Sequence, residues 1–331
     1  MSDKKLPNKY NPPFDITPKM LNLVVEICEV LACIKLDAPN LLVPHLRKTN
    51  RIKTIRASLA IENNSLSLEQ VTAIINGKRI LGNPREIKEV KNAYEAYEQI
   101  MGLKGSSLKH LLKAHGLMMG DLIKDSGRFR DGGVGVVNQK YEVVHLAPKA
   151  EFVPQLMEQL FDWYKSSEHH PLIKSSVFRY ELEFIHPFSD GNGRLGRMWQ
   201  SKLLGEWNEI FYFLPIEELI KEKQALYYQN LAKSDESGNS TSFVEYMLML
   251  IRDSIHALND DTIKDTIKDT INANEKAVLE MLENSPKITR KAMAQALGLA
   301  VITIQRTLDS LAQKGKIERV GANKNGYYRV L

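Results

Sequence analysis

The chain has 331 residues, of which 43% are hydrophobic and 26% charged, a composition typical of a folded protein with a substantial core and more than one domain. Its most apolar stretch, residues 21–36, is interrupted by Glu26 and Glu29, which excludes a membrane-spanning helix, and no basic start followed by an apolar run marks a signal peptide. The two cysteines, Cys28 and Cys33, are spaced for neither a disulfide framework nor a metal knuckle. We therefore expect a cytoplasmic protein without a membrane partner.

The net charge of +5 is unevenly distributed along the chain. Residues 273–331 contain ten Lys and Arg against five Asp and Glu, so the charges of the preceding residues balance to zero. This asymmetry indicates a separate, mildly basic C-terminal module rather than a generally cationic protein.

Helical patterns dominate the chain as far as residue 258. Cap signals mark several helix starts, including Thr17 followed by Pro18, a capping box at Ser67 and Gln70, and Asn83 followed by proline. From the spacing of apolar residues, we predict helices over residues 18–34, 52–61, 84–101, 153–164, 175–185, 192–207, 216–232 and 243–258, with another starting after Ser67.

Two regions depart from this pattern. Valines on both sides of a polar turn at 138–140 predict a β-hairpin between residues 132 and 148. A four-residue repeat of Asp, Thr, Ile and Lys over 261–271 is either a charged helical spacer or a linker. Beyond it, the patterns predict a winged helix-turn-helix, with helices over 275–283, 289–297 and 301–311 and strands over 317–320 and 327–330.

These patterns predict a mostly α-helical protein of several parts. We expect an N-terminal helical region over residues 1–105, a core with a short β-hairpin over 106–256, a linker or helical spacer over 257–273, and a small winged-helix domain over 274–331.

The segment HPFSDGNGRLGR, residues 186–197, combines a loop with the N-terminus of a helix. Gly191 and Gly193 let the backbone turn sharply and bring N–H groups close to a ligand. With the helix dipole behind them, these donors form an anion site suited to phosphate. Arg194 and Arg197 are three residues apart on one helix face, where both can bind further phosphate oxygens.

The acid and the base of the same segment complete a site for phosphate-group transfer. Asp190 lies beside the phosphate loop and would repel a phosphate unless a divalent cation lay between them, so we expect Mg²⁺ there. His186 can act as a neutral general base near pH 7. A simple turn beside a structural histidine is the alternative, but it does not explain the combination of residues.

These residues resemble the signature of the Fic family, His-x-Phe-x-Asp/Glu-Gly-Asn-Gly-Arg-x-x-Arg, with no departure at any defined position. The resemblance implies a Fic-type helical core that transfers AMP from ATP to a Ser, Thr or Tyr hydroxyl of a target protein or of itself. His186 would then accept the proton of that hydroxyl, and Asp190 would bind Mg²⁺ between the α- and β-phosphates.

The resemblance also assigns the nucleotide contacts. Asn192 and the backbone of the two neighbouring glycines, Gly191 and Gly193, would hold the α-phosphate, while Arg194 would contact the β-phosphate and Arg197 the γ-phosphate. The hairpin, residues 134–144, resembles the flap on which a target protein docks by strand addition. Tyr227 and Tyr228 resemble the aromatic pair that encloses adenine, although two core tyrosines on a helix are the alternative.

A second motif concerns regulation. Residues 58–63, SLAIEN, resemble the inhibitory motif Ser/Thr-x-x-x-Glu-Gly/Asn of Fic proteins whose inhibitory helix precedes the core, here over residues 52–63. A Glu62 carboxylate paired with Arg197 would occupy the guanidinium group that should hold the γ-phosphate. Ser58 would be the first residue of this motif. We therefore expect an autoinhibited enzyme; a solvated helix glutamate is the alternative.

The C-terminal module contains candidate residues for binding a further partner. Arg306 on the presumed recognition helix and Lys316 and Arg319 near the wing are candidates for DNA binding, and docking to a protein is the alternative. For the whole chain, the alternatives to AMP transfer are a nucleotide-sensing DNA-binding regulator and a Fic enzyme with another donor or with de-AMPylating activity. A homodimer whose interface controls access to Glu62 is a further hypothesis.

Overall fold

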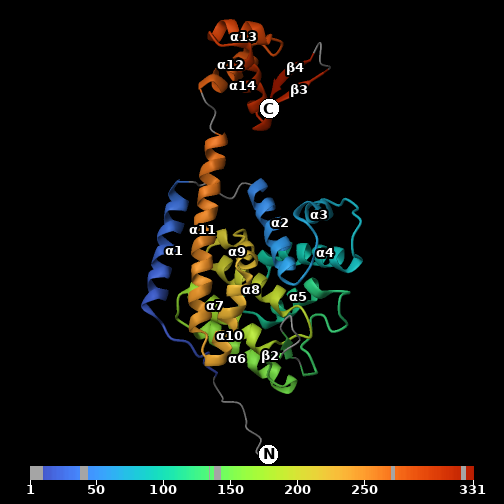
Figure 1. The fold of residues 1–331 in the computed structure, drawn as a ribbon, viewed down its shortest axis with the longest axis vertical. Helices are drawn as coiled ribbons and strands as arrows, with labels where there is room; N and C mark the ends of the chain where they lie inside the picture. Colours follow the sequence, from blue (N-terminus) through green and yellow to red (C-terminus); the bar gives the residue numbers. More distant parts are fainter. Residues whose placement is uncertain (1–9, 38–43, 134, 138–142, 270–272, 322–325) are drawn as a thin grey trace, which may run out of the picture. The chain divides into compact units, whose positions relative to one another are not determined.

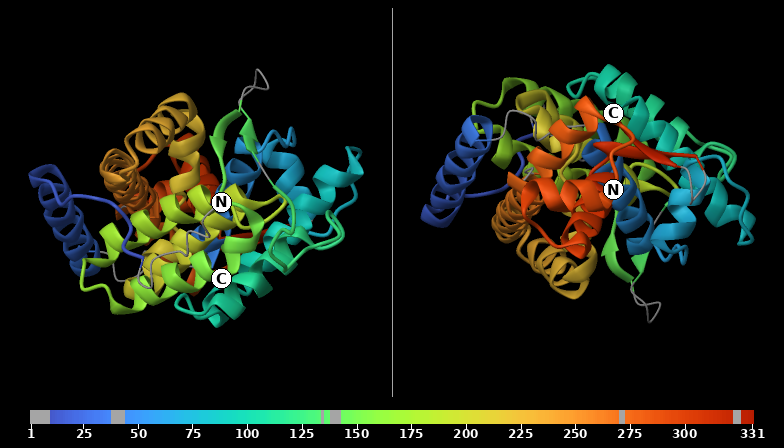
Figure 2. Two further views of the ribbon diagram at one scale, coloured as in Figure 1. Left: turned by 90° about the horizontal axis from the view of Figure 1, so that it is seen from below. Right: turned by 90° about the horizontal axis from the view of Figure 1, so that it is seen from above.

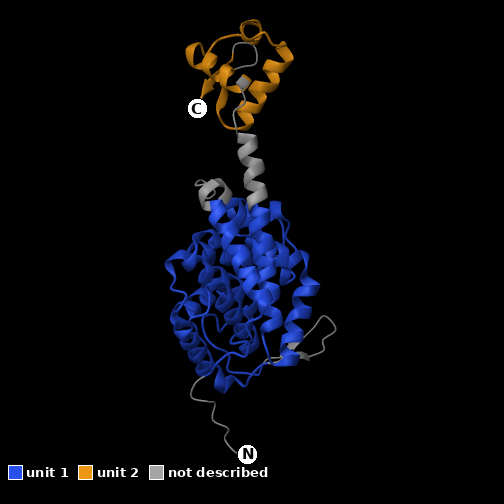
Figure 3. Ribbon diagram, turned by 90° about the vertical axis from the view of Figure 1, so that its left-hand side faces the viewer, with its two compact units in different colours: residues 1–258 blue, residues 259–331 orange. Residues whose placement is uncertain are grey.

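The structure, a computed structural model, describes residues 10–37, 44–133, 135–137, 143–269, 273–321 and 326–331, without side chains at 35–37, 44–46, 135–137, 143–146, 259–269 and 273. It divides into two compact units, residues 1–258 and 259–331, which are described separately below (Figure 3). The prediction of a mostly α-helical chain is confirmed (Figure 1). No described helix has the length and apolar composition needed to cross a bilayer. The expected boundaries near residues 105, 256 and 273 stay predictions.

The N-terminal arm and the first helix pack along a late helix of the same unit. The helices are α1 (Pro18–Asp37) and α11 (Thr241–Asp269). Thr17 Oγ1 accepts a hydrogen bond from the Met20 amide at 3.1 Å, as predicted for a cap, and donates to Glu245 of α11 at 2.7 Å. Further back in the arm, the Tyr10 hydroxyl donates to the buried Glu181 at 2.6 Å. Residues 10–17 are therefore part of the folded unit (Figure 1).

The next four helices pack against one another, and three of them contribute side chains to the candidate site described below. They are α2 (Pro44–Ile61), α3 (Leu68–Ile75), α4 (Pro84–Glu98) and α5 (Leu108–Met119), with a short 3₁₀ helix η1 (Ile100–Gly102). The capping box at Ser67 and Gln70 and the Asn83 cap are present as predicted. Helix α2 begins well before residue 52, and α5 lies where no helix was predicted.

Two buried helices form the centre of the unit. They are α7 (Pro171–Ile185) and α8 (Asn192–Trp207), which pack along each other and are joined by the loop 186–191. Trp199 of α8 is completely buried, and nearly all the remaining residues of this helix are buried too. Since both ends of the loop belong to rigid, buried helices, the loop has a fixed foundation.

The remaining elements of the first unit surround this pair (Figure 2). They are β1 (Gly135–Val137), β2 (Val143–Leu146), η2 (Ala150–Phe152), α6 (Val153–Ser166), η3 (Glu209–Tyr212), α9 (Ile216–Glu222), α10 (Gln224–Ser237) and α11. The strands pair antiparallel, with Gly135 opposite Leu146, which confirms the predicted hairpin; its turn lies outside the described residues. The single helix predicted over 216–232 is wrong, because the chain leaves helical geometry at Lys223 (φ −102°, ψ 32°).

The second unit is a winged helix, as predicted. Its elements are α12 (Ala273–Asn284), α13 (Arg290–Leu297), α14 (Val301–Gln313), β3 (Ile317–Val320) and β4 (Tyr327–Val330). Ile317 pairs with Val330 in the antiparallel wing. Apolar side chains of the three helices and β3 form a separate core, inside which Lys314 makes two 2.8 Å contacts with the buried Glu275.

The buried Glu181 predicts how stability depends on pH. Burial raises its pKa from 4.5 to about 7, against the opposing effect of the hydrogen bond from Tyr10. Between these two values the folded state binds more protons than the unfolded state, so the free energy of unfolding falls as pH rises, by about 3 kcal/mol in total. Gln at this position still accepts the Tyr10 hydrogen bond and does not titrate. We expect Glu181→Gln to gain about 2–3 kcal/mol over wild type between pH 5 and pH 8.

Urea unfolding at the two pH values measures this difference. The exposed Glu236→Gln is the matched control and is expected to track wild type at both values. A Glu181→Gln difference that is the same at pH 5 and pH 8 would contradict the assignment.

Candidate active site

The loop 186–191 has an unusual backbone at both ends. His186 ends α7 in the left-handed region (φ 48°, ψ 60°), although it is not a glycine. Gly191 precedes α8 with φ 88°, and a Cβ there would lie 2.6 Å from the Met119 sulfur. Only glycine fits this position, so the sharp turn expected from the sequence is present.

One ring nitrogen of His186 points back to its own helix. Nδ1 lies 3.3 Å from the carbonyl oxygen of Glu183. When Nδ1 carries the proton and donates it to this carbonyl, Nε2 is the nitrogen that can accept a proton. This is the arrangement that a general base requires.

A buried arginine, Arg130, holds the backbone around His186. Its guanidinium group donates to the carbonyl oxygens of His186 at 2.7 Å and of Ile185 at 3.4 Å. It also donates to those of Gly132 at 2.8 Å and Pro148 at 2.5 Å, on either side of the β-hairpin. Arg130 is only 4% exposed, and burial lowers its pKa. The residue therefore ties both ends of the hairpin to the histidine loop.

Two further side chains fix the middle of the loop. Asn192 accepts from the Phe188 amide at 3.0 Å and donates to the Phe188 carbonyl at 2.9 Å. His115 of α5 stacks on the Phe188 ring at 3.7 Å and lies 3.0 Å from the Asp190 carbonyl oxygen. Because the other His115 nitrogen accepts from Gly127, the nitrogen near Asp190 is the donor, and burial lowers the pKa of the ring. His115 is thus a neutral positioning residue.

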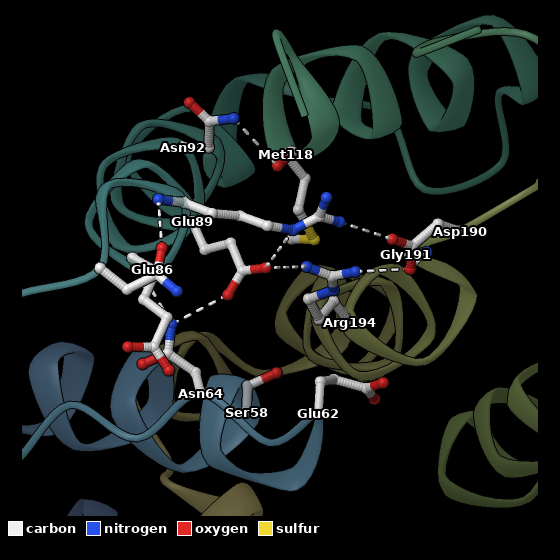
Figure 4. A network of polar contacts seen from close by, with 12 residues as sticks. Ser58, Glu62, Asn64, Glu86, Glu89, Asn92, Met118, Asp190, Gly191 and Arg194 are labelled. Atoms are coloured by element: carbon white, nitrogen blue, oxygen red, sulfur yellow. Dashed lines mark hydrogen bonds and ion pairs between the residues drawn. The ribbon is translucent and has the colours of Figure 1, made fainter. Parts of the chain in front are cut away.

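Asp190 lies between two arginines of different helices. Its carboxylate accepts from Arg194 of α8 at 2.6 Å and from Arg85 of α4 at 3.3 Å. Glu89 of α4 lies 3.4 Å from Arg194 and accepts from Asn64 at 2.9 Å (Figure 4). The candidate metal ligand is therefore part of a network that reaches the end of α2.

Arg197 of α8 is bound by the segment that the sequence singled out as inhibitory. Its Nη2 lies 2.7 Å from the Glu62 carboxylate, and its Nε donates to the Ser58 hydroxyl at 2.9 Å. Nη2 also donates to the Ser58 carbonyl at 2.9 Å. Burial is the largest single influence and acts to lower the pKa of Arg197, but the charge and hydrogen bond of Glu62, together with Tyr227 and Glu183, raise it overall. A Cβ at Gly193 would lie 2.5 Å from the Glu62 carboxylate, so a side chain at this position would collide with the pair.

The two tyrosines that the sequence analysis connected with adenine occupy different environments. Tyr227 is 2% exposed, its ring packs against Phe243, and its hydroxyl accepts from Arg179 at 2.9 Å. Tyr228 is 45% exposed on the adjacent position of α10. A role for either residue in binding adenine stays a prediction.

The candidate residues of the winged helix lie on its surface. The exposed candidates are Arg306 of α14, Lys316 directly before β3, and Arg319 of β3. Gln305, which could read bases from the same helix, is engaged by Arg290 and donates to Asp309 at 2.8 Å. The exposed candidates, Arg306, Lys316 and Arg319, are therefore all cationic.

The sequence analysis did not identify Arg85, Glu89, His115 or Arg130 as site residues. Arg130 bonds main-chain carbonyls up to 56 residues away, which leaves no pattern in the sequence. Arg85 and Glu89 are ordinary charged residues of an amphipathic helix until the fold brings them to Asp190.

The comparisons with known proteins agree with this geometry. The Fic/DOC family model matches residues 105–204, and the winged helix-turn-helix DNA-binding model matches residues 271–318. "Protein adenylyltransferase Fic" of Drosophila willistoni is 27% identical over 217 residues, 61% of this chain and 40% of the relative. The protein of the same name from Aedes aegypti is 28% identical over 220 residues, 63% of this chain and 42% of the relative. The chain thus spans about two fifths of the length of these curated relatives.

A solved structure is similar over almost the whole chain. It is a Fic family protein from Desulfovibrio desulfuricans, 41% identical, with a TM-score of 0.76. The similarity covers 97% of this chain and 98% of that one. The loop 186–191 joins two buried helices, and Arg194 and Arg197 follow it on the second of them. Together with a similarity of this extent, these features show that the chain belongs to the Fic family.

Proposed function

We propose that this protein transfers AMP from ATP to a Ser, Thr or Tyr hydroxyl of a target protein or of itself. The observation that carries the proposal is the loop 186–191, which leads from a histidine with one acceptor nitrogen to the glycines and arginines at the start of α8. The insect relatives described above are named protein adenylyltransferases, and their name supports the same reaction class for this chain.

In the proposed reaction, the target hydroxyl oxygen attacks the α-phosphorus of ATP. The bond between the α-phosphorus and the oxygen bridging to the β-phosphate breaks, and pyrophosphate leaves. The hydroxyl proton passes to Nε2 of His186, whose other nitrogen is oriented by the Glu183 carbonyl. The left-handed backbone of His186, held by Arg130, directs the ring to this position.

The proposed phosphate contacts follow the start of α8. Backbone N–H groups at Asn192 and Gly193 would hold the α-phosphate, because the Asn192 side chain is already bound to Phe188. The Gly191 N–H would join them after leaving the Asp190 carboxylate, to which it donates at 2.6 Å. Arg194 would contact the β-phosphate. Arg197 would contact the γ-phosphate once Glu62 has left it.

The donor set around Asp190 fits Mg²⁺. The described residues contain no group of three or more His, Cys, Asp or Glu side chains that could hold a metal alone, but Mg²⁺ is commonly held by a single carboxylate with waters and substrate phosphates. Asp190 supplies such a carboxylate, with its side chain 39% exposed. When bound, Mg²⁺ would neutralise charge between the α- and β-phosphates.

We further propose that Glu62 restrains the transfer. A carboxylate at 2.7 Å from Arg197 takes the position that a γ-phosphate oxygen would need, and its negative charge repels the phosphate. Since Arg197 is 2% exposed, it cannot serve both anions at once. ATP would bind in a poor pose until α2 moves.

The test of both claims is label transfer from α-labelled ATP with Mg²⁺, using wild type, Glu62→Gly and Glu62→Gly/His186→Ala. We expect label on lysate proteins or on the protein itself to rise at least about tenfold in the single variant, because Arg197 becomes available to the γ-phosphate. Label transfer should be at least about a hundredfold lower in the double variant than in Glu62→Gly, because the double variant lacks the base. The exposed Glu69→Gln is the matched control and should behave as wild type.

Two results decide against the proposals separately. Activity of Glu62→Gly no higher than wild type would refute the restraint while leaving transfer intact. No label in any variant, with ATP binding retained, would refute AMP transfer itself.

We also propose that the winged-helix unit binds DNA. The match of residues 271–318 to a DNA-binding winged helix model and the exposed Arg306, Lys316 and Arg319 favour this second role. We expect Lys316→Glu/Arg319→Glu in the full chain to weaken binding to a duplex at low salt by at least about tenfold, because phosphate contacts are lost. Fluorescence anisotropy measures this.

Lys104→Glu/Lys124→Glu, an equal charge change in the first unit, is the control and should leave DNA binding unchanged. If both variants bind like wild type, or if wild type does not bind, docking to a protein becomes the better explanation of the winged helix.

A further inference from the structure

Helix α4 brings a third arginine to the candidate nucleotide site. Arg85, the second residue of this helix, places Nη2 at 3.3 Å from Asp190 and Nε at 3.6 Å from Glu89. Each oxygen of the Asp190 carboxylate thus accepts from one guanidinium group, Oδ2 from Arg85 and Oδ1 from Arg194. Only Arg194 belongs to the loop signature. Arg85 comes from an element more than 100 residues earlier in the chain.

The two arginines differ in how firmly they are held. The Arg194 side chain is 6% exposed and lies between Asp190 and Glu89. The Arg85 side chain is 56% exposed, at the open side of the same carboxylate. Glu89 is 12% exposed and is held by a hydrogen bond from Asn64. It can therefore act as a fixed counter-ion for both Arg85 and Arg194. Arg85 is therefore the arginine that is able to change partners.

A cation on Asp190 changes the balance of this network. Mg²⁺ and a guanidinium group repel each other, so binding of Mg²⁺ to the Asp190 oxygens favours release of Arg85 from them. A phosphate oxygen bound to a Mg²⁺ that Asp190 held would come close to that carboxylate, because both would belong to the same coordination shell. Arg85 is already 3.3 Å from Asp190, which puts the arriving phosphate within its reach.

The balance of charges in the site also favours a contact between Arg85 and the polyphosphate. In the present state, three acids, Asp190, Glu89 and Glu62, oppose three arginines, Arg85, Arg194 and Arg197. A triphosphate brings more negative charge than one Mg²⁺ neutralises, and the departure of Glu62 from Arg197 compensates for only part of it. An exposed guanidinium group beside Asp190 meets the remaining need.

We propose that Arg85 is a third phosphate-binding arginine of this site, which exchanges the Asp190 carboxylate for the nucleotide polyphosphate when Mg²⁺ and nucleotide bind together. The inference rests on the proposed function of the loop 186–197. It adds a residue of α4, outside the signature, that recognises the polyphosphate and not the adenosine.

The experiment measures binding of ATP and of adenosine to the full-length protein by calorimetry, with Mg²⁺ or with EDTA. All variants carry Glu62→Gly, so that the competing carboxylate is absent. We expect Arg85→Met to weaken ATP binding in Mg²⁺ by about threefold to tenfold, as befits a charge-assisted contact near solvent. Adenosine binding should be unchanged, and the effect on ATP should fall below about twofold in EDTA, where Arg85 keeps its carboxylate partner.

Matched variants separate this inference from the proposed function. Lys88→Met removes a positive charge three residues further along α4, where the side chain contacts Asp121, and should leave ATP binding unchanged. Arg197→Met tests the site itself and should weaken ATP binding. Melting curves establish that each variant is folded; Arg85 is exposed enough that its loss should not affect folding.

Each result has a definite reading. If Arg197→Met weakens ATP binding and Arg85→Met has no more effect than Lys88→Met, the Arg85 proposal is wrong and the proposed function stands. Tighter ATP binding in Arg85→Met would also refute the proposal, because Arg85 would then only shield Asp190 from Mg²⁺. If the Glu62→Gly protein binds no ATP, or Arg197→Met leaves its binding unchanged, both proposals fall.

Discussion

The buried guanidinium group of Arg197 is the constraint on which the site depends. A charge that is 2% exposed must have acceptors, since its burial without them would cost several kcal/mol. In this structure Glu62 and both oxygens of Ser58 are those acceptors. The same interaction therefore fixes the end of α2 on α8 and, in the proposed function, keeps the arginine from a phosphate. Any ligand that replaces Glu62 has to provide equivalent negative charge at the same place.

Around this pair, the backbone of the loop is positioned by groups that do not themselves need to meet a nucleotide. Arg130 fixes the carbonyl of His186, His115 fixes that of Asp190, and Asn192 fixes both backbone groups of Phe188. Each of these side chains is buried. Because Arg130 also bonds both ends of the hairpin, it fixes the hairpin relative to the histidine.

The sequence predicted the elements with strong local signals and missed those held by distant contacts. The loop 186–191 and the capping box at Ser67 follow from residue types at fixed spacing. The early start of α2 does not, because this helix buries polar residues, among them Arg51, whose guanidinium group lies over the rings of Tyr97 and Phe213. An apolar stripe is therefore missing where the helix begins. No glycine or proline lies at the helix break at Lys223, so the sequence carries no local signal for it.

The same division applies to the candidate site. A contact between Glu62 and Arg197 is expected from the resemblance of two motifs and is present in the structure. The hydrogen bond from Arg197 to the Ser58 hydroxyl is known from the structure alone. Arg85 and Glu89 could not be expected, since their contacts with Asp190 and Arg194 arise only when α4 packs beside α5 and the loop. Charged residues on an amphipathic helix carry no local mark of their partners.

The measurement that tests the central claim most directly is the ratio of ATP to ADP affinity, with Mg²⁺, in wild type and in Glu62→Gly. The two nucleotides differ by the γ-phosphate, the group that Glu62 is proposed to keep from Arg197. The account predicts a ratio near one in wild type and a rise of at least about tenfold in the variant, with ADP affinity little changed. An equal gain for ATP and ADP, or no gain for either, would contradict it.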